Sequence, residues 1–338
     1  MGCQMKISVV DLDEYEKSVL EREFSQKGLK DVKFFVGKGI SEVPESLSQT
    51  EVLACFVHSS VTPEILEKMP KLKMIAAMST GYDHIDSKAC KDKGIIVSNV
   101  PSYGNKTVAE YTFALILAAA RKINSARDRV VRGDFNYNGL MGSELNGKTI
   151  GIIGTGRIGY QVAKIAAGFD MNIIAYDSFK NEEIVKLGGR YAGLEELLSL
   201  SDIITIHLPL NENTKHLINE KNIEKIKKGA ILINTARGGI VQTRALIKGL
   251  EKGIISSAGL DVLEMEKESL ENNEAMISRN SCEELKIISL NNLLIRHPKV
   301  FFTPHVAFYT KEAVQRIIEQ TAANIASFIE GNPENRVI

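Results

Sequence analysis

The stretch Gly151-Ile-Ile-Gly-Thr-Gly-Arg-Ile-Gly159 lies near the middle of the chain and decides the fold. The apolar runs Thr149–Ile153 and Asn172–Tyr176 lie on either side of its glycine turn, and Asp177 follows the second run. Both runs have the length of buried parallel strands, and apolar residues between them recur at helical spacing. The order strand, glycine turn, helix, strand and acid predicts a βαβ unit that binds a dinucleotide.

Each glycine of this turn has a physical role in such a unit. Gly154 permits the tight turn, Gly156 lets the backbone approach a pyrophosphate, and Gly159 lets the helix pack on the strand. The amino end of the helix would then face the anion.

Asp177 indicates which dinucleotide binds. Its carboxylate can accept hydrogen bonds from the ribose hydroxyls of NAD and would repel the additional phosphate of NADP. No Arg follows at once, although Lys180 leaves a small opening for NADP. The sequence therefore predicts NAD as the cofactor.

The composition is that of an ordinary globular protein. The chain has 338 residues, of which 44% are hydrophobic and 25% charged, and 42 Lys and Arg balance 42 Asp and Glu. This length allows two domains with their own cores. Because the charges balance, no overall field favours a nucleic acid or an anionic membrane as a partner.

The cysteines and the apolar runs indicate the compartment. Cys3, Cys55, Cys90 and Cys282 are scattered with no CxxC pair, which predicts neither a metal site nor a disulfide framework and fits a reducing compartment. The start shows no secretory apolar region, and the longest apolar stretch, Phe113–Ala120, is too short to cross a bilayer. We expect a cytoplasmic protein.

Strand-like runs alternate with helical segments on both sides of the fingerprint, which predicts parallel sheets in two α/β domains. Before it, strands are expected at Lys6–Leu12, Val32–Val36, Val52–Val57, Met74–Ala77 and Ile95–Val97, and helices at Glu14–Lys27 and Pro63–Met69. After it, strands are expected at Ile203–His207, Ala230–Asn234, Ser256–Leu260 and Val300–Phe302, and helices at Leu194–Leu200, Thr243–Lys252 and Lys311–Gly331.

Three further segments stand out from this alternation. Thr107–Arg121 is apolar all round, which predicts a buried helix, either within a core or in a contact between domains or subunits. Arg127–Glu144 is mixed polar and aromatic and is interpreted as an arm or linker. Glu266–Leu290 is polar with weak periodicity and is expected to be an inserted surface loop or short helices.

A nicotinamide enzyme needs a proton donor or acceptor and a group that holds and polarises its substrate. Arg237, Glu266 and His305 each follow an apolar strand, and ligands bind outside the carboxyl ends of strands in such sheets. A guanidinium can hold a carboxylate bidentately. Arg237 could equally form a surface salt bridge and His305 could be structural. Glu264 reads as a solvated charge, and the pattern alone does not separate Glu266 from it.

The other histidines carry less chemistry. His207 ends a strand before Pro209 and is expected to line the cofactor site, and His84 lies in a predicted turn. His58, His216 and His297 are expected at the surface or at boundaries.

Together, the fingerprint, Asn234-Thr-Ala-Arg-Gly238, the run Asp261-x-x-Glu-x-Glu266 and Pro304-His305 resemble the D-isomer-specific 2-hydroxyacid dehydrogenases over nearly the whole chain. The ending His305–Thr310 is most similar to the D-lactate dehydrogenase branch. The resemblance implies an α/β fold in which a Rossmann-type NAD-binding domain is inserted into a flavodoxin-like substrate (catalytic) domain. The substrate domain would comprise residues 1–102 and 306–338, and the NAD-binding domain residues 103–305, with a dimerisation helix and arm at about 107–146.

The resemblance also assigns roles to individual residues. It implies Arg237, Glu266 and His305 as the catalytic residues, with Glu266 favouring the imidazolium of His305 and Arg237 binding the substrate carboxylate. For the substrate it adds backbone N–H groups near Thr80 and Gly81 and the side chains of Tyr103 and Phe308. Met78 departs from the family, because many lactate-type members carry Arg there. The implied cofactor residues are Gly154, Gly156, Arg157, Ile158, Gly159, Asp177, His207, Leu208, Pro209, Thr214, Thr235, Ala236, Arg237 and Asp261.

The resemblance thus implies an NAD-dependent D-2-hydroxyacid dehydrogenase, a homodimer that reduces a small 2-oxo acid, with pyruvate to D-lactate as the first expectation. A dehydrogenase of bulkier acids such as 2-oxo-4-methylpentanoate or phenylpyruvate is the first alternative, since one methylene changes discrimination by only about 1–3 kcal/mol. An NAD-sensing corepressor is a second. A formate-oxidising relative is disfavoured, because that branch pairs its His with a Gln upstream.

Overall fold

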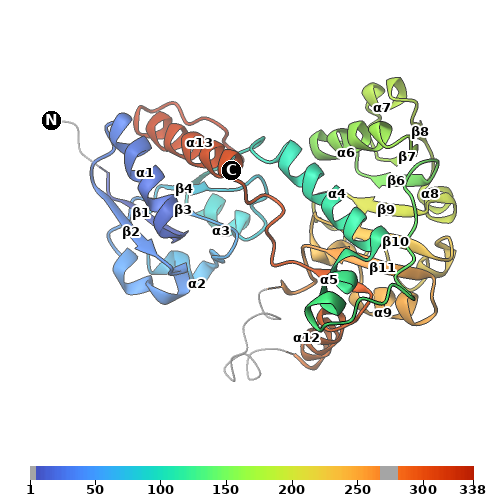
Figure 1. Ribbon diagram of the computed structural model, residues 1–338. Helices are drawn as coiled ribbons and strands as arrows, with labels where there is room; N and C mark the ends of the chain where they lie inside the picture. The colour runs from blue at the N-terminus through green and yellow to red at the C-terminus, as the bar shows by residue number, and fades with distance from the viewer. Residues whose placement is uncertain (1–4, 267–280) are drawn as a thin grey trace. The chain divides into compact units, whose positions relative to one another are not determined.

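The computed structural model describes residues 5–266 and 281–338, and the chain forms two compact units (Figure 1). The first unit comprises Met1–Tyr103 and Tyr309–Ile338, and the second comprises Gly104–Phe308. The second unit is therefore an insertion in the first, as the resemblance implied for the fold.

The first unit is a five-stranded parallel sheet in the order β2-β1-β3-β4-β5, with helices on both faces. Helices α1 and α13 pack against each other on one face (Figure 1), while apolar residues of α2 and α3 join the core on the other. The elements are β1 (Ile7–Leu12), α1 (Glu14–Gln26), β2 (Val32–Val36), two 3-10 turns (Ile40–Glu42 and Pro44–Leu47), β3 (Val52–Cys55), α2 (Pro63–Glu67), β4 (Met74–Ala77), α3 (Ser87–Asp92), β5 (Ile96–Ser98) and α13 (Lys311–Ile329).

The second unit is a seven-stranded parallel sheet in the order β12-β11-β10-β9-β6-β7-β8. Helices α4 and α6 cover one face, and α8, α9 and α12 cover the other, each over its own apolar core. The strands are β6 (Thr149–Ile153), β7 (Asn172–Tyr176), β8 (Arg190–Tyr191), β9 (Ile203–Ile206), β10 (Ala230–Asn234), β11 (Ile255–Leu260) and β12 (Val300–Phe302). The helices are α4 (Asn105–Arg121), α5 (Ile123–Val131), α6 (Arg157–Gly168), α7 (Glu182–Lys186), α8 (Leu194–Leu200), α9 (Thr243–Glu251) and α12 (Cys282–Ile295), with 3-10 turns at Ile223–Lys225 and Gly238–Ile240.

The helix α4 is buried as its composition predicts. Nine of its residues are buried, and it packs on α6 and beside β10 and β11. Gly259 of β11 lets it approach, because a Cβ at this position would lie 3.0 Å from the Cβ of Leu115. The helix α4 thus belongs to the core of the second unit.

Of the two segments predicted to be irregular, the prediction for the arm was partly wrong. The arm predicted over Arg127–Glu144 starts as a helix, α5, which follows a left-handed turn at Lys122 (φ 52°) and has no buried residue that would give it an apolar stripe. The segment Glu266–Leu290, predicted as an inserted surface loop or short helices, lies partly outside the described residues, and its last part belongs to α12, in line with the second alternative. That helix begins at a capping box of Ser281 and Glu284 and buries only Asn291 and Leu294, so its periodicity is weak.

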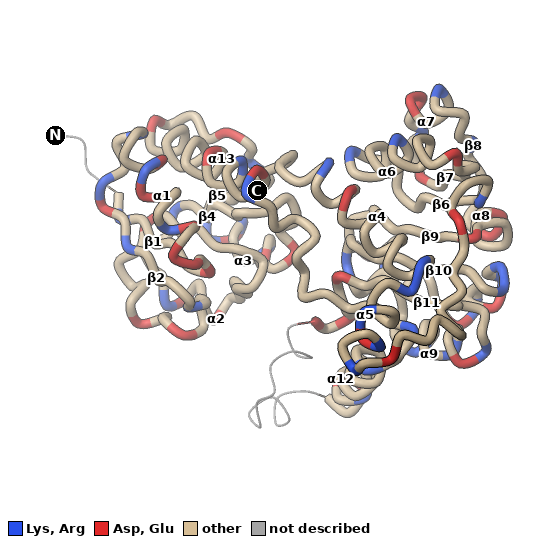
Figure 2. Tube along the Cα trace, in the orientation of Figure 1, with Lys and Arg blue, Asp and Glu red and all other residues tan. Residues whose placement is uncertain are grey.

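Charged side chains are distributed over both units. Figure 2 shows Lys and Arg interspersed with Asp and Glu along the trace of each unit. Among the described residues no helix is long and apolar enough to cross a membrane. In the same part of the chain no three His, Cys, Asp or Glu side chains form a group that could hold a metal ion.

Candidate active site

The glycine turn between β6 and α6 has the geometry that a pyrophosphate needs. Gly154 has a φ of +96°, and a Cβ there would lie 2.6 Å from the carbonyl oxygen of His207. A Cβ on Gly159 would overlap the carbonyl of Gly154, whereas one on Gly156 would have no atom within 4 Å. No side chain caps the amino end of α6. The turn thus leaves open backbone and uncapped N–H groups where the anion of a dinucleotide would bind.

Asp177 is half-buried directly after β7 and is fastened to the glycine turn. One carboxylate oxygen accepts the backbone N–H of Thr155 at 2.6 Å and its hydroxyl at 3.2 Å, and the other accepts the N–H of Phe179 at 3.1 Å. Since a carboxylate has about four acceptor sites, capacity remains for a ribose hydroxyl. The Lys180 ammonium lies 5.9 Å from the centre of the Tyr191 ring. These residues fit NAD.

The backbone of His207 lies against the same glycine turn. Its Nε2 is 2.9 Å from the hydroxyl of Thr205, while its Nδ1 is buried without a hydrogen-bond partner among the described residues. Burial lowers the pKa of His207 to about 3, so the ring is neutral at physiological pH. Its carbonyl oxygen is the atom that Gly154 approaches.

The other predicted cofactor residues lie in this unit too. Arg157 is exposed and Ile158 half-buried at the start of α6, and Leu208 and Pro209 follow β9. The Thr214 hydroxyl donates to the carbonyl of Pro209 at 2.6 Å, and the Thr235 hydroxyl is 3.0 Å from that of Thr112 in α4.

The turn after β10 presents Arg237. Asn234, itself buried, accepts the N–H of Ala236 at 3.0 Å and donates to the carbonyl of Arg237 at 2.9 Å. The half-buried guanidinium donates to the carbonyl of Ala236 at 2.8 Å. A side chain at Gly238 would overlap the backbone of Leu263, so only glycine lets this turn lie against the segment after β11.

His305 and Glu266 are brought together from segments 39 residues apart. The distance from His305 Nδ1 to Glu266 Oε1 is 3.2 Å, and the side chains are 19% and 20% exposed. Nε2 of the ring has no partner among the described residues. Both segments contain left-handed backbone, at His305 (φ 55°) and at Met265 (φ 51°).

Asp261 fixes the turn that carries His305. Its carboxylate is fully buried and accepts the Thr303 hydroxyl at 2.6 Å and the N–H groups of Val306 and Ala307 at 3.0 and 2.9 Å. The backbone N–H of His305 donates to the Asp261 carbonyl at 2.9 Å. Burial raises the pKa of Asp261, and these hydrogen bonds act in the opposite direction.

Sequence reasoning missed a second acid–histidine pair. We expected Glu264 to be a solvated charge and His216 to lie at the surface or at a boundary, yet His216 Nε2 is 2.5 Å from Glu264 Oε1 and the Glu264 side chain is only 9% exposed. The other oxygen of Glu264 accepts the N–H of Thr243 at 3.1 Å, and its backbone carbonyl accepts the Asn291 side chain at 2.5 Å. No local pattern announces this network, because its partners come from four separate segments.

The predicted substrate residues of the first unit lie after β4 and β5. Thr80 is exposed and Gly81 half-buried in the loop after β4, and the Tyr103 carbonyl accepts the Arg316 guanidinium of α13 at 2.8 Å. Met78, which departs from the family pattern, is 1% exposed. In the second unit, Phe308 is buried at 9% exposure.

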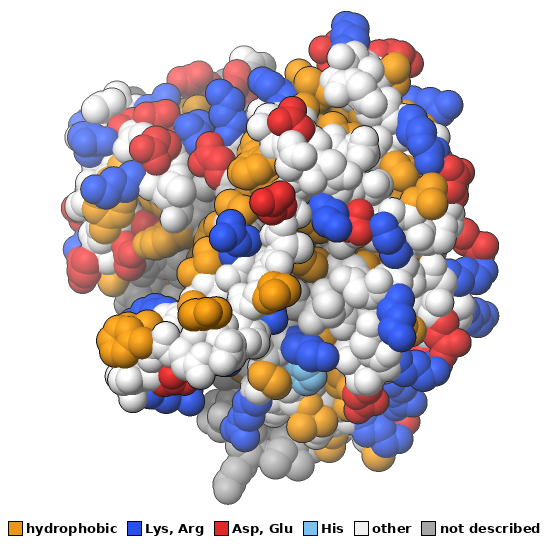
Figure 3. Space-filling model, turned by 45° about the vertical axis from the view of Figure 1, so that its right-hand side comes forward, with side chains coloured by type: hydrophobic (Ala, Val, Ile, Leu, Met, Phe, Trp, Pro, Cys, Tyr) orange, Lys and Arg blue, Asp and Glu red, His pale blue; other side chains and the backbone are white. Residues whose placement is uncertain are grey.

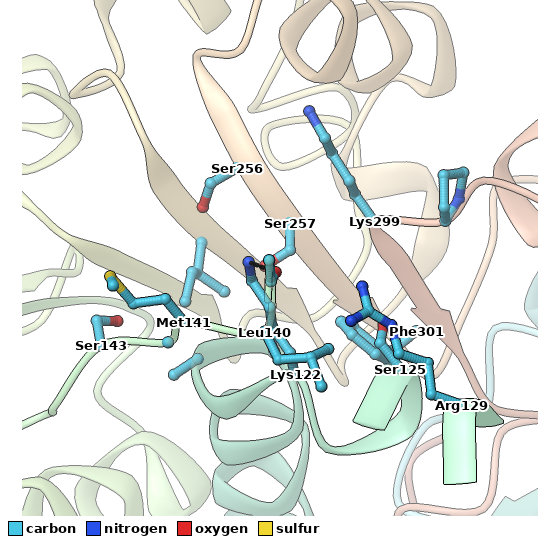
Figure 4. Close-up of a pocket in the computed structure, with 16 residues that line it drawn as sticks. Lys122, Ser125, Arg129, Leu140, Met141, Ser143, Ser256, Ser257, Lys299 and Phe301 are labelled. Carbon is cyan, nitrogen blue, oxygen red and sulfur yellow. Dashed lines mark hydrogen bonds between the residues drawn. The ribbon is translucent and has the colours of Figure 1, made fainter. Parts of the chain in front are cut away.

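A cavity of about 430 Å³ lies in the second unit, and no predicted site residue is among those that line it (Figure 4). Ile231, Ser256 and Ser257 line it toward the amino ends of β10 and β11, whereas Arg237 follows the carboxyl end of β10. Lys122 and Arg129 line the cavity and also bind the arm. Lys122 donates to the Gly139 carbonyl at 2.9 Å, and Arg129 donates to the Asn138 carbonyl at 2.6 Å.

Comparison with known proteins gives the family. Residues 113–307 match the model of the D-isomer specific 2-hydroxyacid dehydrogenase, NAD binding domain. The 2-hydroxyacid dehydrogenase homolog 1 of Schizosaccharomyces pombe is 39% identical over 290 residues, covering 85% of each chain. A glyoxylate reductase of Aeropyrum pernix is 38% identical over 298 residues, covering 86% of this chain and 83% of its own.

A solved structure of a family member extends the likeness to the whole fold. The D-lactate dehydrogenase from Aquifex aeolicus, complexed with NAD and lactic acid, has a TM-score of 0.85 and 37% identity, covering 97% of this chain and 96% of its own. With the family model and the geometry of the glycine turn, these likenesses settle the class of the protein and its cofactor, NAD. The chain belongs to the D-isomer-specific 2-hydroxyacid dehydrogenases, a family of NAD-dependent oxidoreductases.

Proposed function

We propose that the protein interconverts pyruvate and D-lactate, with His305 moving the substrate proton. The observation that carries the proposal is the partly exposed His305–Glu266 pair, held by the buried carboxylate of Asp261. Because Nδ1 faces Glu266, Nε2 is the ring atom that gives a proton to the substrate oxygen or takes one from it. Bound NADH supplies the hydride for such a reduction.

Arg237 would hold the substrate carboxylate and polarise the neighbouring carbonyl. A guanidinium has five N–H donors in a planar fork, a geometry that suits bidentate binding of a carboxylate. From the family resemblance, backbone N–H groups of Thr80 and Gly81 are further proposed donors to a substrate carboxylate. Tyr103 and Phe308 would contact the side-chain end of the substrate.

Pyruvate is favoured over other 2-oxo acids by likeness to the D-lactate dehydrogenase bound to lactic acid, which extends over nearly the whole chain. Glyoxylate, which lacks the methyl group of pyruvate, is a second candidate because of the relative from Aeropyrum pernix. The difference is one methyl group, which changes transition-state binding by roughly 1–3 kcal/mol.

Steady-state oxidation of NADH with a panel of 2-oxo acids tests the proposal. The panel holds pyruvate, glyoxylate, 2-oxo-4-methylpentanoate and phenylpyruvate, and chiral chromatography identifies the hydroxy acid formed. We expect the highest kcat/KM with pyruvate and a D product. A higher kcat/KM with another acid would replace pyruvate as the substrate, and no turnover with any of them would favour an NAD-sensing binding protein.

We also infer that two copies of the chain associate through the arm and α4. The arm exposes large apolar side chains that a monomer would leave in water, and Figure 3 shows a face with such hydrophobic groups at the surface. Val131 is 71% exposed, Phe135 78%, Tyr137 81% and Met141 88%. Sedimentation equilibrium should give twice the 37.3 kDa of one chain, and a monomer at micromolar concentration would overturn the inference.

A further inference from the structure

We propose that Asn99, held from behind by Asn324 of α13, is a positioning residue that aims the backbone N–H of Gly81 at the substrate carboxylate. The inference rests on the proposed function, in which this loop binds the carboxylate. Asn99 directly follows β5 in sequence and is 8% exposed, and Asn324 is fully buried.

All three carbonyl oxygens of the loop Ser79–Gly81 accept hydrogen bonds from the protein. The Ser79 carbonyl accepts the N–H of Val100 at 3.0 Å, and the Thr80 carbonyl accepts Nδ2 of Asn99 at 2.7 Å. The Gly81 carbonyl accepts the Ser79 hydroxyl at 2.7 Å. The loop is therefore fastened on its carbonyl side.

The donors of the loop are left unused. Among the described residues, the backbone N–H groups of Thr80 and Gly81 have no acceptor, and the Thr80 hydroxyl is already committed to the Val100 carbonyl at 2.7 Å. Thr80 is exposed and Gly81 half-buried, so these N–H groups are near solvent. Successive unpaired N–H groups of this kind form a small site for an anion.

Peptide geometry connects Asn99 to one of these donors. The carbonyl of Thr80 and the N–H of Gly81 belong to the same planar trans peptide and point in opposite directions. By holding the Thr80 carbonyl, the Asn99 side chain fixes the direction of the Gly81 N–H. The Val100 backbone fixes the Thr80 N–H in the same way through the Ser79 carbonyl.

Asn99 is itself held rigidly. The backbone carbonyl of Asn99 accepts Nδ2 of Asn324 at 2.9 Å, and its backbone N–H donates to the backbone carbonyl of Asn335 at 3.1 Å. Oδ1 of Asn324 accepts the side-chain amides of Asn335 at 2.8 Å and Gln320 at 3.0 Å. A chain of amides thus runs from α13 to the loop. It carries no charge, so it orients the loop without neutralising the substrate.

The test compares Asn99→Ala with a matched control, Ser8→Ala. Ser8 is 4% exposed in the same sheet and loses one buried hydrogen bond, to Thr50 at 2.8 Å, but the bond does not involve the loop. For Asn99→Ala we expect the KM for pyruvate and the Kd for oxamate to rise about tenfold, as for one hydrogen bond to a charged group. The kcat should change less than threefold and the Kd for NADH should stay constant. Ser8→Ala should change none of these constants.

A second variant covers the case in which the alanine chain does not fold. Asn99→Asp has the same shape but places an oxygen against the Thr80 carbonyl, so we expect a larger rise in KM than with alanine. An unchanged KM and oxamate Kd in either folded variant overturns the inference, and so does an equal loss of activity in Ser8→Ala. Failure of the proposed function looks different, because the unaltered protein would then neither reduce pyruvate nor bind oxamate.

Discussion

The second unit contains two glutamate–histidine pairs whose acids are two residues apart in the chain. Glu264 lies 2.5 Å from His216, and Glu266 lies 3.2 Å from His305. The residue types are the same, but their surroundings differ. In the first pair the acid is 9% and the histidine 32% exposed, whereas in the second both are about equally accessible, at 20% and 19%.

The two pairs differ in how many of their hydrogen-bonding atoms already have partners in the protein. The two carboxylate oxygens of Glu264 take the His216 ring and the Thr243 N–H, which joins three segments into one support. In the described residues, the carboxylate of Glu266 has His305 as its only partner, and Nε2 of His305 remains available. A glutamate beside a histidine is thus no mark of chemistry by itself. The unused nitrogen of His305 is what suits that pair to proton transfer.

The strongest test of the comparison is His305→Gln. We expect kcat to fall about 10³-fold, because general acid–base catalysis contributes about 10²–10⁴-fold and glutamine cannot supply it. Fluorescence titration should show unchanged NADH binding. The matched control is His297→Gln. The ring of His297 accepts the N–H of Lys299 at 3.1 Å, and its replacement should leave kcat unchanged. Retained turnover in His305→Gln would move the proton donor elsewhere.

Glu266→Gln should have the next largest effect. The amide keeps the shape of the side chain but loses the carboxylate charge that faces the ring during proton transfer, so we expect kcat to fall roughly 10²-fold. The free energy of unfolding, from urea titration, should change by less than about 0.5 kcal/mol because the side chain supports little else. A kcat within threefold of the parent would remove Glu266 from the proposed mechanism.

Glu264→Gln should show the reverse balance. One carboxylate oxygen becomes an NH₂ group. Facing the Thr243 N–H, this group leaves a buried donor unpaired; facing His216, it forces the ring into the tautomer that accepts at Nε2. We expect the free energy of unfolding to fall by about 2 kcal/mol, with kcat reduced less than tenfold. If this variant were as stable as the parent but as inactive as Glu266→Gln, the two pairs would not differ in the way described.

A third histidine, His207, has no carboxylate partner among the described residues. Its pKa is lowered to about 3 by burial, against roughly 6.5 in an unfolded chain. Between these values only the unfolded chain takes up the proton, so stability is fully present above pH 6.5 and declines by about 1.4 kcal/mol per pH unit as the pH falls towards 3. Urea titrations at several pH values should show a shallower decline for His207→Asn. Parallel curves would contradict the assignment.

Asp177 is a carboxylate that has no histidine partner among the described residues. Asp177→Ala removes the carboxylate that we propose as the acceptor for the ribose hydroxyls and as the source of repulsion of the NADP phosphate. We expect the ratio of NAD to NADP affinity to fall about fivefold, corresponding to about 1 kcal/mol, close to one hydrogen bond. Titrations of both cofactors measure it, and an unchanged ratio would show that Asp177 does not select between them.

The sequence predicts elements with local causes and misses those assembled from distant parts. Strands such as Thr149–Ile153 and Asn172–Tyr176 have the predicted bounds, because short apolar runs end at glycine or polar residues. The pairing of Glu264 with His216 requires the close approach at Gly238, which no periodicity reveals. The same holds for Asn99, whose partners lie at Thr80 and in α13.

The insertion of one unit in the other also has a consequence for biosynthesis. The second unit is one continuous segment, Gly104–Phe308, and its core is complete once those residues have been made. The first unit lacks α13 until residue 329 has been synthesised, and with it the buried Asn324 that steadies Asn99. Since domains generally fold as units, the inserted unit has all of its residues before the unit that surrounds it can complete its core.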